Sequence, residues 1–289
     1  GVVPHKGPAP AAFFVGAVSV AREAAWMTTL VPGREPWETA AVVDESGGQA
    51  GRGRVLLLLH GMGTTGDVWL PWAPLLEQTW AGRWLAPDLA GHGWAEPLPS
   101  YTFAGFADRI ARGLALGDRL VVLGHSLGGV VGLALAARAA GAPVDAVVGL
   151  GIKAVWSPDE LARAADLAAR PVSWFATRAE AARRYLRVSG LAGLVPPDHP
   201  VVDAGLRQVD GRWRLAMDPT AFAVGEPDLA ALLAATDAPV VLARGEHDPM
   251  VSDEQLKEYG VPVATLPGLG HNAHVEDPAA VLALLDPYR

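Results

Sequence analysis

Residues 120–129 read Leu-Val-Val-Leu-Gly-His-Ser-Leu-Gly-Gly, and this stretch decides the fold. Its four leading apolar residues are typical of a strand that is buried on both faces of a parallel sheet. The Ala- and Leu-rich run from Leu127 to Ala140 follows at once and predicts a helix. Between them, the residues around Ser126 fit the pattern G-x-S-x-G in a strand–turn–helix setting, where a sharp turn exposes a serine hydroxyl at the carboxyl edge of the sheet. Ser126 is therefore the candidate nucleophile.

Further apolar runs alternate with helical patterns along the chain. A run with helical spacing extends from Tyr101 to Leu116, and a Gly-rich loop is expected over Ser46 to Gly53. The other segments predicted as strands are Trp37 to Val43, Val55 to Leu59, Trp84 to Ala86, Val144 to Leu150, Val240 to Ala243 and Val261 to Leu266. Strands that alternate with helices imply right-handed crossovers, so we predict an α/β fold with a mostly parallel, doubly wound sheet.

One segment interrupts this alternation. Within it the sequence predicts helices over Pro158 to Arg170 and Arg178 to Ser189, and a small hairpin over Leu206 to Met217 that turns at Asp210-Gly211. So long a stretch exceeds an ordinary connection between two strands of one sheet. We therefore expect residues 157–218 to form a mainly helical cap, inserted after the sixth core strand and lying over the active site. Residues 1–156 and 219–289 are then the core.

Composition limits the classes of function. The chain is 51% hydrophobic and 19% charged, which suits a large core, and its net charge of −8 disfavours a nucleic-acid partner. The absence of cysteine excludes disulfides, thiolate catalysis and cysteine-ligated zinc. We expect a small-molecule substrate, no cofactor and no metal, and the oligomeric state stays open.

The N-terminal region, residues 1–36, has no counterpart in the predicted core. Its apolar segment Ala9 to Ala21 is too short to span a bilayer, which takes about 20 residues. We expect a core helix or strand there, with a leader or interfacial segment as the alternative. A cytoplasmic location is favoured, and secretion is left open.

A second glycine-rich loop, His60-Gly61-Met62-Gly63, directly follows the buried run Val55 to Leu59. An oxyanion hole needs two backbone N–H groups that point at one oxygen. Leu127, the residue after the candidate nucleophile, offers one of them, and Met62 is the best source of the second. His60 itself is expected to be structural.

The candidates for the base and the acid are the histidine and the carboxylate that are expected at the same edge of the sheet as Ser126. Of the eight histidines, His271 is favoured because it lies in a loop just past the last predicted strand, whereas His274 falls where the chain turns into the final helix. Asp248 and Glu246 both follow the run Val240 to Ala243, and Asp248 is favoured because it lies deeper in its loop and has the shorter side chain. The resulting order is Ser126, Asp248, His271.

On these residues the chain resembles the α/β-hydrolase superfamily, and within it the capped, serine esterase- or lipase-like branch. The resemblance extends from about Trp37 to Leu285, and it also includes Asp88 and His92, which it implies are loop-shaping residues. It implies hydrolysis of a carboxylic ester through an acyl-enzyme. Other bonds (C–C, thioester or lactone), a cofactor-free perhydrolase and a receptor-like binding protein remain alternatives on the same fold.

The substrate pocket is the least determined part of the site. His125 should border the acyl site, Lys153 could meet a substrate carboxylate, and three aromatic residues at the start of the cap could form an apolar wall: Trp156, Trp174 and Phe175. Since no charged anchor stands out, the expected substrate is a small to medium apolar ester.

Overall fold

The computed structural model describes residues 54–115, 117–138 and 141–289. The expectations for residues 1–36, for the segment Ala9 to Ala21, for the strand Trp37 to Val43 and for the loop Ser46 to Gly53 lie outside the described residues. The described part of the chain contains 21 helices and strands, the first of which begins at Arg54.

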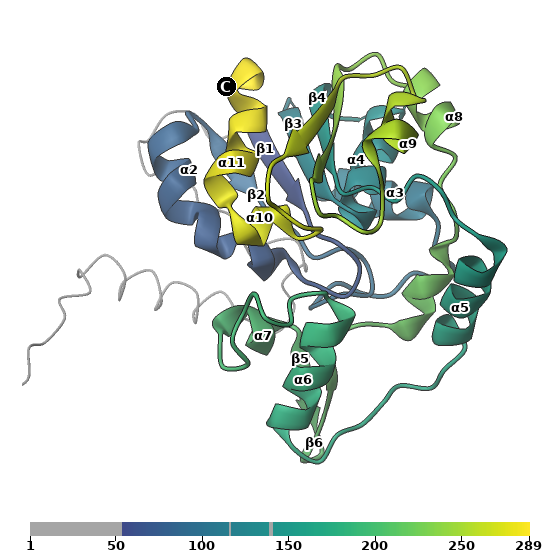
Figure 1. Cartoon of the computed structure of the whole chain (residues 1–289). Helices are drawn as coiled ribbons and strands as arrows, with labels where there is room; N and C mark the ends of the chain where they lie inside the picture. Colours follow the sequence, from purple (N-terminus) through teal and green to yellow (C-terminus); the bar gives the residue numbers. More distant parts are fainter. Residues whose placement is uncertain (1–53, 116, 139–140) are drawn as a thin grey trace, which may run out of the picture. The chain divides into compact units, whose positions relative to one another are not determined.

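A six-stranded parallel sheet forms the centre of the fold (Figure 1). Its strand order is β2-β1-β3-β4-β7-β8, and every neighbouring pair is parallel. The strands are β1 (Arg54–Leu59), β2 (Arg83–Leu85), β3 (Arg119–His125), β4 (Val144–Leu150), β7 (Val240–Gly245) and β8 (Val263–Leu266). Each of them overlaps a predicted apolar run, which confirms the parallel α/β class.

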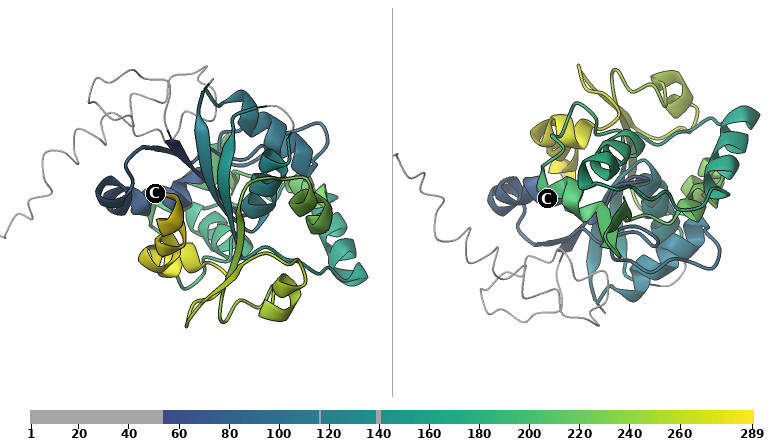
Figure 2. Two further views of the ribbon diagram at one scale, coloured as in Figure 1. Left: turned by 90° about the horizontal axis from the view of Figure 1, so that it is seen from above. Right: turned by 90° about the horizontal axis from the view of Figure 1, so that it is seen from below.

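Helices cover both faces of the sheet, as the views along it show (Figure 2). Alternate residues of β1 divide between two apolar clusters, with Leu56 and Leu58 in one and Val55, Leu57 and Leu59 in the other. The first cluster also includes residues of η2 (Gly66–Trp72), α2 (Ala73–Thr79), α10 (Ala273–Glu276), α11 (Pro278–Leu282) and η4 (Ala283–Tyr288). The second includes residues of α3 (Phe103–Arg112), α4 (Leu127–Ala136), α8 (Leu229–Ala234) and α9 (Asp253–Lys257). The sheet is therefore doubly wound, as predicted.

Two helices are shorter than the sequence pattern suggests. Helix α3 begins after Thr102, whose side chain accepts a hydrogen bond from the Gly105 N–H at 2.9 Å, and it ends before Gly113. Helix α4 ends at Ala136, where the Arg138 N–H bonds to the Leu135 carbonyl in a tightened final turn. Apolar spacing continues past both ends, which is why the pattern predicted longer helices.

The segment between β4 and α8 holds the elements of the proposed cap. These are α5 (Pro158–Ala168), α6 (Arg178–Val188), α7 (Pro200–Ala204) and the antiparallel pair β5 (Leu206–Val209) and β6 (Arg212–Leu215). The short helix η3 (Pro219–Val224) follows them, in the part of the chain assigned to the core. Both longer helices start with a capping box, Ser157 with Glu160 and Thr177 with Glu180. The predicted hairpin is confirmed: Asp210 and Gly211 have φ of 49° and 76°, as a primed turn requires.

Candidate active site

Ser126 lies at the turn between β3 and α4 in a conformation that is costly for a residue with a Cβ. Its φ is 51° and its ψ is −114°. The Ser126 N–H donates to the Leu150 carbonyl at 2.8 Å, which ties the turn to the neighbouring strand β4. A Cβ on Gly124 would collide with the Gly128 carbonyl oxygen, so the turn closes only with glycine at that position. The strained turn presents the serine at the carboxyl edge of the sheet.

The loop after β1 packs directly against this turn. A Cβ placed on Gly61 would lie 3.5 Å from the Cβ of Ser126 and 2.7 Å from His125 Nδ1. No described residue accepts a hydrogen bond from the backbone N–H of Met62 or of Leu127. Two donors beside Ser126 are therefore available to an external oxygen, although their common aim at one point stays a prediction.

Two buried side chains hold this loop in shape. His60 Nε2 accepts the Leu89 N–H at 2.8 Å, so its proton resides on Nδ1, which faces the Gly61 carbonyl at 2.9 Å. Burial lowers the pKa of His60 to about 4, so the ring stays neutral. The Asp88 carboxylate accepts hydrogen bonds from Gly66 and Trp94 at 2.8 and 2.9 Å. Both residues thus bond backbone groups of the loops, which suits a structural role.

The structure brings His271 and Asp248 together. His271 Nδ1 donates to Asp248 Oδ2 at 2.9 Å, and the Asp248 side chain has no exposed surface. The other carboxylate oxygen accepts the Met250 N–H at 2.8 Å, which fixes the orientation of the carboxylate. Nε2 of His271 has no partner among the described residues, and 23% of that side chain is exposed. One ring nitrogen is thus held, and the other is left for a proton transfer.

His125 links the serine turn to the histidine loop. Its Nε2–H donates to the His271 carbonyl at 2.9 Å, and the two imidazole rings lie 4.7 Å apart between centroids. Burial lowers the pKa of His125 well below its usual value, so the ring is neutral. Only 2% of the residue is exposed. His125 is thus packed between the loop after β1 and the histidine loop, and its place at the border of the acyl site stays a prediction.

The competing acid and base lie elsewhere. Glu246 is exposed, and its Oε2 accepts the Gly268 N–H at 2.8 Å. His274 is fully buried against Trp69, with ring centroids 4.7 Å apart, and neither of its ring nitrogens has a hydrogen-bond partner in the described part of the chain. Burial lowers its pKa to about 3. Neither side chain forms the contact that His271 and Asp248 make.

The predicted pocket residues do not share one pocket. Lys153 and Trp156 line an open cavity of about 450 Å³ together with Asp248, but the Lys153 ammonium is already paired with Glu160 at 3.0 Å. Phe175 lines a separate cavity of about 860 Å³ that lies wholly within residues 175–197. The lining of neither cavity includes Ser126 or His271.

Trp174 is 38% exposed, and the Arg212 guanidinium stacks over its ring at 4.7 Å. The predicted aromatic wall is therefore not a single wall: after α5 the chain leads Trp174 and Phe175 away from Trp156. An ion pair already occupies Lys153, which argues against its expected role as a carboxylate anchor.

Part of the proposed cap contacts the candidate site. A Cβ placed on Gly63 would lie 2.8 Å from Val188 Cγ1 at the end of α6, so this helix rests on the loop after β1. Asn272 Nδ2, next to the candidate base, donates to the Gly190 carbonyl at 3.1 Å. These contacts place an apolar cap residue above the loop that holds Met62.

Two residues around the acid–base pair were not singled out from the sequence. Gly151 has φ of 64°, and a Cβ there would lie 3.2 Å from both Asp248 Oδ2 and His271 Nδ1. Arg244, near the end of β7, bonds the backbone of the loop that carries Asp248. An arginine at the end of an otherwise apolar buried run was the available signal for Arg244.

Neither a membrane-spanning helix nor a metal-binding cluster occurs among the described residues. No helix there is both long and apolar enough to cross a bilayer. No group of three or more histidine, aspartate or glutamate side chains in that part of the chain is arranged to hold a metal ion.

Comparison with known proteins places this geometry in a family. The chain is 37% identical over 90 residues to the uncharacterized protein Rv2715 of Mycobacterium tuberculosis (strain ATCC 25618 / H37Rv), a match that covers 30% of this chain and only 26% of that relative. The structure of the esterase Rv0045c of M. tuberculosis is similar with a TM-score of 0.65 and 24% identity, over 95% of this chain and 97% of that one. The structure of E-2-(acetamidomethylene)succinate hydrolase has a TM-score of 0.65 and 25% identity, over 82% and 91%. A sequence profile of the alpha/beta hydrolase family matches residues 56–284, and the chain therefore belongs to the alpha/beta hydrolase family.

Proposed function

We propose that this hydrolase cleaves carboxylic esters with Ser126 as nucleophile, His271 as general base and Asp248 as the acid that orients the histidine. The observation that carries the proposal is the 2.9 Å bond between His271 and Asp248. Ser126 is held at positive φ, and its neighbour in sequence, His125, contacts the His271 ring. A strained serine at the same sheet edge as a histidine with one ring nitrogen fixed and the other free suits nucleophilic catalysis.

The proposed reaction is acyl transfer in two steps. Ser126 Oγ attacks the ester carbonyl while His271 Nε2 takes its proton, and the N–H groups of Met62 and Leu127 stabilise the oxyanion. The alcohol then leaves with the proton from His271. Water repeats the sequence on the acyl-enzyme and releases the acid, and Asp248 remains ionised throughout.

A small to medium apolar acyl or alkyl group fits the surroundings best. Met62 and Val188 both pack on the apolar cluster beside the loop after β1, and the ammonium of Lys153 is already paired. No charged anchor for a substrate is therefore evident among the residues near the site, which favours burial of apolar surface as the source of binding. We also propose residues 157–218 as the cap that closes this side of the site.

The test is turnover of a series of p-nitrophenyl esters by wild type and by Ser126→Ala. The substitution should lower kcat by about 10⁵- to 10⁶-fold, because the members of such a triad act as a unit. An organophosphate should label wild type at Ser126 and leave the variant unlabelled. Wild type that neither turns over any ester nor labels at Ser126 contradicts the proposal.

The same experiment separates the neighbouring activities. A parallel series of thioesters and lactones with matched acyl groups ranks the bonds by kcat/KM. Loss of labelling in Ser126→Ala together with a clear preference for a thioester would keep the nucleophile and replace the ester substrate.

A further inference from the structure

Arg244 is a nearly buried cation next to the candidate acid. It is the penultimate residue of β7, and the whole residue is 9% exposed. The rest of that strand is apolar or glycine, and a buried guanidinium is costly unless its N–H groups are satisfied. Its partners therefore indicate why the fold keeps a charge at this point.

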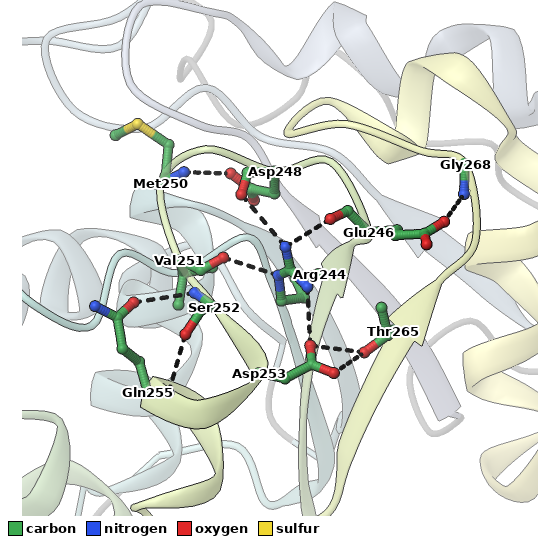
Figure 3. Close-up of polar contacts among 10 residues, drawn as sticks. All are labelled: Arg244, Glu246, Asp248, Met250, Val251, Ser252, Asp253, Gln255, Thr265 and Gly268. Atoms are coloured by element: carbon green, nitrogen blue, oxygen red, sulfur yellow. Dashed lines mark hydrogen bonds and ion pairs between the residues drawn. The ribbon is translucent and has the colours of Figure 1, made fainter.

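The guanidinium reaches three carbonyl groups of one loop (Figure 3). Nε donates to the Val251 carbonyl at 2.8 Å, and Nη2 donates to the Glu246 carbonyl at 2.8 Å and, at a longer 3.4 Å, to that of Asp248. Along the chain, these acceptors belong to a residue before Asp248, to Asp248 itself and to a residue after it. A single side chain thus holds the loop before, at and after the carboxylate that contacts His271.

An ion pair anchors the other side of Arg244. Nη1 donates to Asp253 Oδ1 at 2.9 Å, and the Thr265 hydroxyl contacts the two oxygens of the same carboxylate at 2.7 and 2.8 Å (Figure 3). Thr265 belongs to β8, the strand that leads into the histidine loop. The network therefore connects the loop of the acid with the strand that precedes the base.

We propose that Arg244 is a positioning residue for catalysis, which acts by holding the Asp248 loop so that the carboxylate meets His271 Nδ1. The inference rests on the proposed function. Lysine cannot replace it, because one ammonium on a flexible stem cannot satisfy a carboxylate and separate carbonyl groups in the fixed directions of a guanidinium.

The first test is kinetic. Arg244→Met should lower kcat on a p-nitrophenyl ester by about 10- to 100-fold with little change in KM, since a displacement of about 1 Å can cost 10²-fold. Arg244→Lys should fall between wild type and Arg244→Met, because it restores only the charge beside Asp253. Activity is expressed per site that an organophosphate labels, so that a partly unfolded sample does not count as a slow enzyme.

A double-mutant cycle separates positioning from a general structural effect. In an Asp248→Ala background, Arg244→Met should change kcat by less than about 3-fold, because the group that it positions is already gone. The control is Arg119→Met, which removes a more exposed arginine–aspartate pair with Asp145, at 2.6 and 3.2 Å, at the amino end of β3 and should leave kcat unchanged. An equal loss from Arg244→Met in both backgrounds overturns the inference.

A spectroscopic measurement needs no turnover. With ¹⁵N-labelled histidine, NMR reports which ring nitrogen of His271 carries the proton, with His271→Ala used to assign the signal. Wild type and Arg119→Met should show the proton on Nδ1, and Arg244→Met should show a mixture of tautomers. An unchanged tautomer in folded Arg244→Met contradicts the inference even if the protein proves not to be an esterase, so the two failures are distinguishable.

Discussion

The serine turn (residues 124–129) and the acid loop (residues 245–253) both leave the carboxyl edge of the sheet, but different forces hold them. In the turn, glycine backbones are packed so closely that a Cβ on Gly124 or Gly128 would strike a main-chain carbonyl. In the acid loop, the guanidinium of Arg244 and the Asp248 carboxylate bond the backbone. Steric exclusion defines the first region, and directed polar contacts define the second.

This difference decides how each region should respond to substitution. The turn should be intolerant of added volume, whatever its chemistry, because a close-packed backbone has nowhere to move. The acid loop should tolerate changes of shape at its exposed positions and be sensitive to the loss of particular donors and acceptors. The predictions below test that contrast.

After Ser126→Ala, the largest effect should come from the acid loop. Asp248→Asn should lower kcat by about 10⁴-fold. A neutral amide does not stabilise the imidazolium, and it allows the histidine to adopt the wrong tautomer. Steady-state rates on a p-nitrophenyl ester measure this, and the free energy of unfolding shows whether the fold is kept.

Glu246→Gln is the matched control within the same loop. Among the described residues the Glu246 side chain accepts a hydrogen bond only from the Gly268 N–H, and glutamine retains an oxygen acceptor for that bond. We expect kcat within about 3-fold of wild type, since the neutral amide oxygen weakens one exposed hydrogen bond without removing it. A loss comparable to that of Asp248→Asn would mean that the acid has been assigned to the wrong carboxylate.

The serine turn should respond to a single methyl group. In Gly128→Ala the new Cβ would press on the carbonyl groups of Leu59 and His60, which belong to the end of β1 and the loop after it. Overpacking of this kind costs about 3 kcal/mol. Urea unfolding should report that loss in the free energy of unfolding, and ester turnover should fall with it.

Gly105→Ala provides the comparison. This glycine lies in α3, and the atoms closest to its added Cβ would be side-chain atoms, Thr102 Oγ1 at 3.1 Å and Leu98 Cδ1 at 3.2 Å, with the nearest backbone oxygen at an ordinary contact distance of 3.9 Å. We expect a change within about 1 kcal/mol, since alanine favours the helix while the neighbours shift slightly. Equal destabilisation by both substitutions would show that the turn is no more tightly packed than an ordinary helix.

The contrast also explains what the sequence could predict. Continuous runs such as Val55 to Leu59 identify buried strands because each strand position depends mainly on its own burial. The hairpin at Asp210-Gly211 and the capping boxes of α5 and α6 are likewise local signals. Ser126 belongs to this class, since its turn is encoded within a few residues.

Features that depend on which particular side chains and carbonyl groups meet in the folded chain were less accessible. Nothing near Arg244 in the sequence indicates that its guanidinium meets the carbonyl groups of the following loop and a carboxylate that Thr265 also contacts. The burial of His125 depends on the histidine loop, 146 positions away along the chain, whose carbonyl it bonds. The aromatic residues predicted to form one wall could not be grouped from the sequence for the same reason, because the path of the chain after α5 decides which of them face one another.

The smallest effect concerns His274, which is packed against the ring of His125 at 4.2 Å and carries two ring nitrogens without partners in the described part of the chain. Since its pKa is lowered to about 3 in the folded state, the unfolded chain takes up a proton first as the pH falls below about 6.5. The stability that this neutral ring contributes is therefore complete above that pH and is lost progressively toward pH 3. Each such group steepens the pH dependence of the free energy of unfolding by up to about 1.4 kcal/mol per pH unit.

His274→Leu should remove that share, so that the free energy of unfolding of the variant falls less steeply between about pH 6 and pH 4. Urea unfolding of the variant and of wild type at a series of pH values measures this change in slope. The difference between the two proteins is needed because burial raises the pKa of Asp67 to about 6, and that group acts in the opposite direction in both of them. Turnover near neutral pH should stay within about 10-fold of wild type, because no catalytic contact is removed. A slope identical to that of wild type would mean that His274 is protonated in the folded protein as readily as in the unfolded chain. A loss of turnover as large as that of Asp248→Asn would mean that His274, and not His271, is the base.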